Sequence, residues 1–413
     1  MTENLLPKTR LLIERSAFGQ HISEFCTWLQ AERYSAWTTH LHVLRLEQTL
    51  PMMRTAAPGE LLGAVDLATA FDSSRGPQTR RKCAAATRRA YMPFLQSCGR
   101  LRRDMANDRF SALLQAYHRH LSELRGLSES SRGHHAQTVF AFLAHAVGPQ
   151  QQLSVITQID VERFVARRSK EVSRHSMQHV IAHLRAFLCY CRHHGHIEVA
   201  LDVIDTPRTY RAELPPKALP WSTVERLLAS IDHKSKSGWR DHCVLHLLAN
   251  YGLRPSEVVA LRLDSIDWAA GTLRVIQRKT GTELLLPLAS PTLKLLQDYL
   301  EQDRLHHTTV DSELFLRARC PFGALRHFAL NDIFEKRMRL AHLACPKPSH
   351  VYSLRHTFAM RLLTRGVGVK AIGDVLGHRR LDSTCTYLRL DIEMLRGVAL
   401  EVPTLRRQGG RHA

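Results

Sequence analysis

The segment VLGHRRLDSTCTYLRL, residues 375–390, combines a Leu-Gly helix end with one imidazole and one phenol. His378 follows the glycine directly, and Tyr387 lies nine residues further on. Because glycine commonly ends helices, the sequence predicts that His378 lies at a turn. A tyrosine taken alone is usually an interface or core residue. The segment therefore indicates a function only together with three other segments upstream.

Two of these segments each place an arginine near the start of a predicted helix. In YGLRPSEVVALRL (251–263), Arg254 lies between a glycine that ends one helix and a proline that suits the first turn of the next. An arginine there lies beside a helix N-terminus, where anions are favoured, and its planar fork suits phosphate. In VYSLRHTFAMRLLTRG (351–366), an amphipathic helix has Arg355 near its start. Either arginine by itself could be an ordinary surface residue.

The third segment, LRVIQRKTGTELLLPL (273–288), predicts a β-hairpin. Two β-rich runs, at 272–277 and 283–288, flank Lys-Thr-Gly, a composition typical of a tight turn. Lys279 lies at the tip, eight residues before Pro287. A lysine in an exposed turn, taken alone, indicates no function.

In this order and spacing, the four segments resemble the motifs of the phage-integrase, or tyrosine recombinase, family over roughly residues 215–400. The resemblance implies a catalytic set of five residues: Arg254, Lys279, Arg355, His378 and Tyr387. The arginines and the histidine would hold the scissile phosphate, and the tyrosine would attack phosphorus to give a 3′-phosphotyrosine. The lysine would protonate the 5′ leaving oxygen. The covalent link keeps the phosphodiester energy, so no metal, ATP or other cofactor is expected.

The second arginine motif departs from the family's usual His-x-x-Arg-His pattern at its first position. That position is Tyr352, whereas Arg355 and His356 keep their places. In the family, the first histidine assists proton transfer at the attacking tyrosine or positions the phosphate. A phenol, with a pKa near ~10, is a poor base at neutral pH. His350 could substitute, although it is two residues out of register. Glu257 occupies the usual acidic position of the first motif, so Tyr352, His356 and Glu257 are candidates for supporting roles.

The first half of the chain predicts helices and an internal repeat. The segment 21–44 is similar to the segment that starts at Leu114, with matching positions 92 residues apart. Later matches lie 94 and then 96 residues apart, as small loop insertions would cause. We interpret the pattern as two copies of a four- or five-helix unit, near 15–103 and 108–200. Chance similarity between amphipathic helices is the alternative.

The sequence therefore predicts a mainly α, multi-domain protein. Its helical N-terminal DNA-binding domains, interpreted as duplicated SAM-like units, would precede an α+β tyrosine-recombinase catalytic domain with a small antiparallel sheet. The expected parts are a helical domain at 1–105, a core-binding helical domain at 106–205, a linker at 206–220, a catalytic domain with a C-terminal helix at 221–400, and a tail at 401–413. Four prolines indicate the linker, and Ser222-Thr-Val-Glu225 predicts a capping box after it. Catalytic-domain helices are expected near 222–232, 240–251, 256–262, 291–304, 331–343, 353–365 and 369–376.

Charge favours a polyanion as partner. The formal net charge is +20, and basic side chains release counterions condensed on nucleic acid. Nine Lys or Arg and no acid lie between Arg75 and Arg103, which favours phosphate contact over a solvated charged face. The candidate DNA-binding residues are Arg80, Arg81, Lys82, Arg88, Arg89, Arg174 and Arg185. The nine scattered cysteines include no CxxC pair, so free thiols and no metal site are expected.

The expected function is site-specific recombination or integration of double-stranded DNA for a mobile element. A homotetramer is expected in the synapse and a monomer or dimer when free, with other recombinase subunits as further partners. Residues 391–403 are expected to form a helix that docks on a neighbouring protomer. No stretch approaches the ~20 apolar residues of a membrane helix, so a cytoplasmic, nucleoid-associated protein is expected. The alternatives are a type IB topoisomerase and a non-catalytic DNA-binding relative of recombinases.

Overall fold

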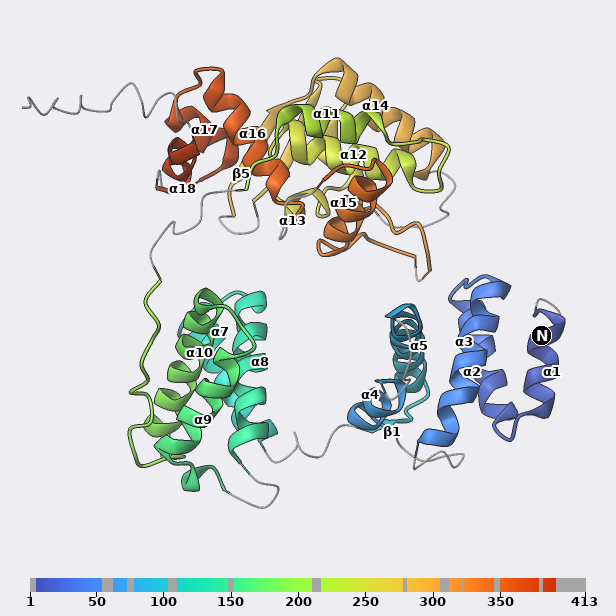
Figure 1. Ribbon diagram of the computed structural model, residues 1–413, viewed down its shortest axis with the longest axis vertical. Coiled ribbons are helices and arrows are strands. Elements are labelled where there is room, and N and C mark those ends of the chain that lie inside the picture. Colours follow the sequence, from blue (N-terminus) through green and yellow to red (C-terminus); the bar gives the residue numbers. More distant parts are fainter. Residues whose placement is uncertain are drawn as a thin grey trace, which may run out of the picture. The chain divides into compact units, whose positions relative to one another are not determined.

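The computed structural model describes residues 5–53, 62–72, 78–102, 110–147, 152–209, 217–277, 281–304, 312–320, 322–344, 350–378 and 382–390 (Figure 1). The chain divides into two compact units, Met1–Arg211 and Ala212–Ala413. The first unit is almost entirely helical and contains two separate hydrophobic cores.

Where the structure describes it, the first of these cores is formed by five helices. They are α1 (Pro7–Arg15), α2 (Gly19–Ala31), α3 (Ala36–Thr49), α4 (Ala64–Asp72) and α5 (Gln78–Ser97). A short 3-10 helix, η1 (Leu50–Met52), follows α3. Two-residue strands β1 (Leu62–Gly63) and β2 (Leu101–Arg102) pair in parallel. Ile22, Phe25 and Leu29 are fully buried on one side of α2, which is the helical spacing predicted there.

The second core is formed by four helices, α7 (Ser111–Glu123), α8 (Glu129–Ala146), α9 (Gln158–Ser169) and α10 (Arg174–His193), with η2 (Leu153–Val155) before α9. Side chains cap the starts of three helices: the Ser128 hydroxyl accepts from the Ser131 amide, the Ser173 hydroxyl accepts from the Ser176 amide, and Thr157 forms a capping box with Asp160. The extended chain after α10 adds Ile197, Leu201 and Ile204 to this core.

The second unit combines helices with one small sheet. Its helices are α11 (Trp221–Ala229), α12 (Gly238–Asn250), α13 (Pro255–Val258), α14 (Ser290–Gln302), α15 (Ala329–Leu340), α16 (Ser353–Thr364), α17 (Val369–Leu376) and α18 (Asp382–Cys385), with 3-10 helices η3 (Leu263–Ser265) and η5 (Thr386–Leu390). Strands β3 (Ile266–Asp267), β4 (Thr272–Ile276) and β5 (Glu283–Pro287) form an antiparallel sheet in that order. The prediction of a mainly helical protein with a small antiparallel sheet is confirmed.

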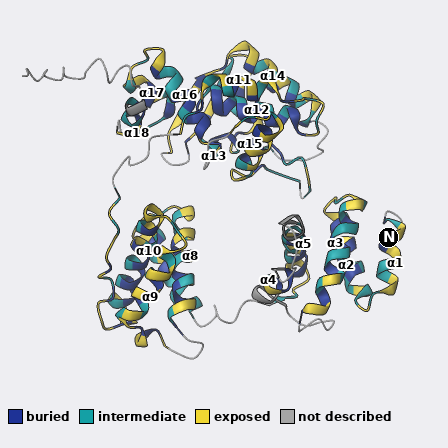
Figure 2. Cartoon of the chain, viewed as in Figure 1, coloured by how far each residue is buried: buried dark blue, intermediate teal, exposed yellow. Residues whose placement is uncertain are grey.

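Helix α12 lies at the centre of the second unit, and most of its residues are buried (Figure 2). It packs against α11, α14, α15 and α16. At its start, Asp241 accepts hydrogen bonds from Arg240 (Nη2, 2.6 Å) and Arg337 of α15 (Nη2, 2.6 Å). Because Asp241 is 1% exposed, this ion cluster fixes α15 to α12 inside the core.

Two local predictions in this unit are wrong. Helix α11 begins at Trp221, with Pro220 as N-cap and no side-chain cap, so Ser222 does not start a capping box. The Glu225 carboxylate instead accepts a hydrogen bond from Trp221 Nε1 (2.6 Å). Helix α13 ends at Val258 rather than near 262, because the Leu261 carbonyl accepts from the Leu314 amide (2.8 Å) and the chain turns toward the sheet.

Candidate active site

Four of the five predicted catalytic residues come together in the second unit. Arg254 precedes α13, Arg355 lies in the first turn of α16, His378 follows α17, and Tyr387 lies in η5. Lys279 lies outside the described residues. The hydrogen bond between the Gln277 amide and the Thr282 carbonyl (2.9 Å) closes the β4–β5 hairpin on either side of it.

Arg355 is the most enclosed member of the site, at 1% exposed. Its Nη1 donates to the Gly252 carbonyl (2.5 Å), and its Nη2 donates to the Leu376 carbonyl (2.6 Å). Its Nε is buried and has no hydrogen-bond partner among the described residues. A buried cation that is held by carbonyl dipoles and keeps an unmet donor favours an incoming anion.

Glu257 fixes the direction of Arg254. Its carboxylate accepts from the backbone amide of Arg254 (2.8 Å) and from Nη1 of the same residue (2.5 Å). The remaining terminal nitrogen, Nη2, lies 3.4 Å from the Gly377 carbonyl, in the turn that carries His378. Glu257 is 3% exposed, so its position is set by packing. The acidic residue of the first motif therefore aims the first arginine at the site.

His378 lies between Arg355 and Thr384. Its Nε2 is 3.2 Å from Arg355 Nη2, and its Nδ1 is 2.7 Å from Thr384 Oγ1. Because a guanidinium only donates, Nε2 accepts and Nδ1–H donates to the threonine; the tautomer is inferred from this network. Burial, followed by repulsion from Arg355 and Arg254, lowers the pKa of His378 to about 4. The imidazole is therefore neutral at pH 7.

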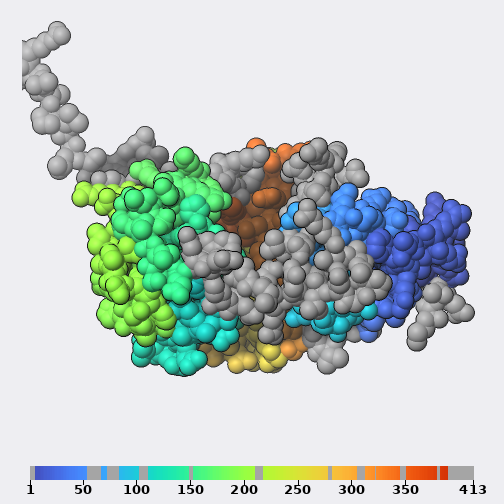
Figure 3. Space-filling view, turned by 90° about the horizontal axis from the view of Figure 1, so that it is seen from below, coloured from blue at the N-terminus to red at the C-terminus, as the bar shows by residue number. Residues whose placement is uncertain are grey.

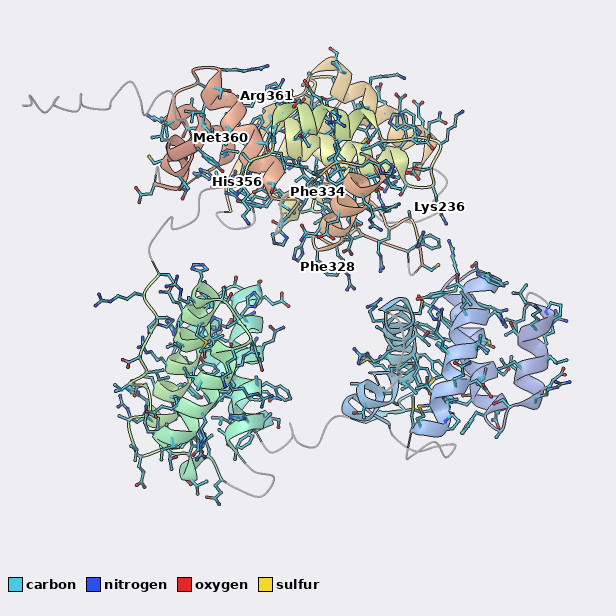
Figure 4. The ribbon with its side chains drawn as sticks, in the orientation of Figure 1. Lys236, Phe328, Phe334, His356, Met360 and Arg361 are labelled. Atoms are coloured by element: carbon cyan, nitrogen blue, oxygen red, sulfur yellow. The ribbon has the colours of Figure 1, made fainter. Side chains whose placement is uncertain are left out.

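Tyr387 is held by His356. Its hydroxyl lies 3.0 Å from His356 Nδ1, and its ring belongs to a small core with Phe358, Leu363 and Leu376. Burial raises the pKa of Tyr387 to about 12 and, with the charge of Arg355, lowers the pKa of His356 to about 4. Both groups are therefore neutral, and the phenol donates to Nδ1 in the tautomer that carries the imidazole proton on Nε2. His356 projects from α16 (Figure 4).

Tyr352 lies at the position where the family usually has histidine, and among the described residues the hydrogen bond to the Tyr387 hydroxyl comes from His356 and not from Tyr352. It is the N-cap residue of α16 and is 38% exposed. Its ring meets the His356 ring edge-on, with centroids 5.0 Å apart. Tyr352 therefore covers the imidazole that holds Tyr387.

Two further residues of the site were missed by the sequence analysis. Thr384 orients His378, and Gln277, which is 2% exposed, packs against the turn at Gly377. A Cβ added to Gly377 would lie 1.7 Å from Gln277 Nε2, and the glycine has φ +62°, so this close approach requires glycine. Neither residue type carries a signal in the sequence, because their roles depend on contacts between separate elements.

The predicted DNA-binding residues all lie in the first unit. Arg80, Arg81 and Lys82 are in α5, with side chains outside the described set. Arg88 is half-buried and Arg89 exposed on the same helix. In α10, Arg174 is exposed, whereas Arg185 is half-buried and donates to the Ile204 carbonyl.

Comparison with known proteins gives two matched segments. Residues 217–394 match the Phage integrase family, and residues 114–195 match the Phage integrase, N-terminal SAM-like domain. A putative integrase/recombinase, y4rA, of Sinorhizobium fredii is 33% identical over 294 residues, covering 70% of each chain. Tyrosine recombinase XerC of Pelobacter propionicus is 27% identical, covering 68% of this chain and 92% of the relative.

Solved structures share the fold. A λ integrase dimer bound to a core site has a TM-score of 0.52 at 17% identity, covering 72% of this chain and 99% of that one. XerH recombinase bound to its difH substrate, in the post-cleavage complex, has a TM-score of 0.54 at 18% identity, covering 69% and 83%. The fold, and the site in which guanidinium and imidazole groups surround a phenol, define a tyrosine site-specific recombinase. The chain belongs to the phage integrase family.

In the ranges that the structure describes, no helix is long and apolar enough to cross a membrane. No cluster of three or more His, Cys, Asp or Glu in those same ranges has the arrangement of a metal site.

Proposed function

We propose that this recombinase cuts and rejoins duplex DNA through a covalent 3′-phosphotyrosine at Tyr387. The observation that carries the proposal is the pocket around that phenol. Its hydroxyl bonds His356, and the neighbouring Arg355 keeps a buried donor that no described residue accepts. An oxygen of a phosphodiester matches that donor in charge and in hydrogen bonding.

In the proposed reaction, Arg254, Arg355 and His378 bind the non-bridging oxygens of the scissile phosphate. The Tyr387 oxygen attacks phosphorus as its proton passes to His356. The bond from phosphorus to the 5′ oxygen breaks, and Lys279 supplies a proton to that oxygen. A 5′ hydroxyl of the partner strand then attacks the phosphotyrosine and returns the phenol. Each cut exchanges one phosphoester for another, so no net energy input is needed.

His356 is the residue that we propose as proton acceptor. It is neutral, and in the tautomer with the proton on Nε2 its Nδ1 accepts the hydrogen bond from Tyr387. A bound phosphodiester would raise the pKa of His356 and of His378, since a nearby anion favours the protonated imidazole. DNA binding would therefore prepare both histidines for the charge that develops in the transition state.

The wider assignments belong to the same proposal. We propose domains at 1–105, 106–205 and 221–400, joined to a tail at 401–413, that act as a tetramer on two specific DNA sites of a mobile element in the compartment that holds the DNA. A similarly folded λ integrase tetramer is bound to a Holliday junction, at a TM-score of 0.52, which supports testing this assembly. The predicted docking helix at 391–403 lies outside the described residues.

Trapping of covalent adduct tests the chemistry. The native chain is incubated with a pool of nicked duplexes of randomised sequence, in which cutting near the nick releases a short strand and prevents resealing. We expect a denaturant-stable protein–DNA adduct with the native chain and with Tyr190→Phe, a matched control in α10, but none with Tyr387→Phe. Sequencing the trapped DNA gives the site.

Other outcomes would contradict the proposal. Noncovalent binding without adduct would favour the DNA-binding relative, and relaxation of supercoiled plasmid without site preference would favour the topoisomerase. For the proton step, His356→Gln should slow adduct formation by at least ~100-fold, the usual lower range for a general base. An unchanged rate would remove His356 from the reaction.

A further inference from the structure

The two helical cores of the first unit correspond helix by helix. Helices α2, α3, α4 and α5 match α7, α8, α9 and α10 in order. The final helices of the two sets, α5 (Gln78–Ser97) and α10 (Arg174–His193), each have 20 residues and start 96 residues apart. Figure 3 shows the surfaces of the two sets, blue for α1–α3 and teal to green for α7–α10. Within the described ranges, helix α1 has no counterpart in the second set.

Aromatic contacts give the first evidence that the match is one of structure. In the first set, the Phe25 ring of α2 contacts Tyr91 of α5 at 5.3 Å with an interplanar angle of 81°. Phe25 also contacts Phe94, one turn further along α5, at 5.2 Å and 52°. A ring of the first matched helix is thus held between two rings of the last.

The same three positions make the same contacts in the second set. The Tyr117 ring of α7 contacts Phe187 of α10 at 5.2 Å and 71°, and contacts Tyr190 at 5.1 Å and 53°. Phe187 and Tyr190 lie 96 residues after their counterparts. Equal distances and similar angles at matching positions are not expected of two unrelated helical bundles.

The helix ends agree as well. Ser35 caps α3 by accepting from the amide three residues on (3.2 Å), and Ser128 caps α8 in the same way (3.3 Å). Beyond α5, Gly99 has φ +65°, and the next amide donates to the Leu95 carbonyl (2.8 Å). Beyond α10, Gly195 has φ +71°, and the next amide donates to Cys191 (2.9 Å). One unit is therefore present twice.

The two copies differ on one side of the last helix. In the second copy, Gln178 and Arg185 of α10 hold the extended chain that follows: Gln178 Nε2 donates to the Pro207 carbonyl (2.8 Å), and Arg185 donates to the Ile204 carbonyl. The matching positions of α5 are Lys82 and Arg89, seven residues apart on one helix side. Arg89 is exposed. Lys82 thus places a cation where the second copy has an amide, and the arginine that is half-buried and bound to the linker in the second copy is exposed in the first.

The surrounding sequence is basic as well. Nine Lys or Arg and no Asp or Glu lie between Arg75 and Arg103, and of these Arg100 is paired with Glu24 (2.8 Å). The matched family segments cover 114–195 and 217–394, and the first copy lies outside both. We infer that the first copy is a second DNA-binding module, and that the Lys82–Arg89 side of α5 binds the phosphate backbone of duplex DNA. The inference rests on the proposed DNA partner but not on the covalent chemistry.

Salt dependence of binding tests this inference without knowledge of the DNA site. The full-length chain is titrated with a random-sequence 50-base-pair duplex at several salt concentrations. Each phosphate contact contributes about 0.9 to the slope of log affinity against log salt. Lys82→Gln/Arg89→Gln should therefore reduce the slope by about 2. The swap Lys82→Arg/Arg89→Lys should keep the native slope, because both charges remain.

A matched control is provided by α1, in which Lys8 and Arg15 are both exposed and lie seven residues apart, the same interval as Lys82 and Arg89. Lys8→Gln/Arg15→Gln removes the same charge from the same core and should leave the slope within about 0.5 of native. An equal loss in both double variants, or no loss in either, would overturn the inference. So would an unchanged slope with reduced self-association of the α5 variant, which would make this side a protein interface. No duplex binding by the native chain would instead refute the proposed function.

Discussion

The hydrogen bond between His378 and Thr384 offers a sharp test of how the site is built. Thr384 is 1% exposed, and its hydroxyl accepts from His378 Nδ1 at 2.7 Å. Thr384→Val keeps the shape of the side chain but removes the acceptor, so the buried Nδ1–H has no partner. Leaving a buried donor unsatisfied costs about 1–3 kcal/mol.

This cost should fall more heavily on the DNA-bound state than on the free protein. The imidazole is neutral in the free protein, where its pKa is lowered to about 4. It gains positive character when its Nε2 side faces phosphate, and hydrogen bonds from charged donors are roughly twice as strong as neutral ones. At about 1.4 kcal/mol for each tenfold change in rate, Thr384→Val should slow cleavage by roughly 5- to 100-fold.

Single-turnover formation of the covalent adduct, at saturating protein and on a nicked duplex, measures this rate. Thr384→Ser keeps the hydroxyl and should remain within about threefold of the native rate. If Thr384→Val cleaves as fast as Thr384→Ser, the threonine does not orient His378, and the reasoning from this hydrogen bond is refuted.

Three further predictions concern stability. Gly252→Ala should lower the free energy of unfolding more than Gly366→Ala. Both glycines have positive φ (+62° and +79°), but a Cβ added at Gly252 would lie 2.3 Å from Phe358 Cδ1, whereas one added at Gly366 would contact nothing. Equal urea unfolding of the two variants would show that packing is unimportant there. Asp241→Leu should lower the free energy of unfolding by about 3–5 kcal/mol, because it removes the carboxylate that pairs with two buried arginines. Arg337→Met should lower it less, because Asp241 stays paired with Arg240. The reverse order of the two variants in urea unfolding would contradict this. The free energy of unfolding should fall as pH drops from about 6.5 to about 4, because six buried or half-buried histidines with pKa values near 4 bind protons in that range only when unfolded. Their contribution should be fully present above pH 6.5, and the urea midpoint at pH 7.5 and 5 checks the sign. These histidines are His42, His183, His242, His246, His356 and His378.

Periodicity and punctuation in the sequence were sufficient to predict most of the helices. The predicted helix at 369–376 has the observed bounds of α17, and that at 353–365 differs from α16 by one residue, because a glycine ends each of them. The predicted capping box was wrong because Ser, Thr and Glu at suitable spacing do not reveal whether the chain enters the helix through a preceding proline. The repeat was visible only as similarity between sequences, whereas the aromatic contacts make it a similarity of packing.

For the candidate active site, the sequence indicates the main residues but not the groups that position them. Arg254, Arg355, His378 and Tyr387 could be proposed from four motifs in a family's order, and the structure brings them together. The partners that aim them could not, because each bond joins elements that are separate in the chain. The Gly252 carbonyl meets Arg355 across 103 residues, and Gln277 meets the Gly377 turn across a similar interval. Backbone carbonyls have no residue type to recognise, so their role becomes visible only in three dimensions.

The burial of this pocket also predicts that the Tyr387 phenol is unreactive in the free protein. Tyr387 is 3% exposed with a pKa raised to about 12, and its partner His356 has a pKa of about 4, so the proton remains on the phenol. Arg355 is equally enclosed and is held by two carbonyls. In the proposed reaction a phosphodiester would have to reach Arg355, and because Arg355 is 1% exposed we expect the turn at Gly377 or the η5 segment to move. The phosphodiester would then raise the pKa of His356, so that entry of DNA both opens the site and makes His356 a better proton acceptor. As the proposed nucleophile, Tyr387 would thus stay protonated and covered until DNA enters, because its ring lies in a small hydrophobic core.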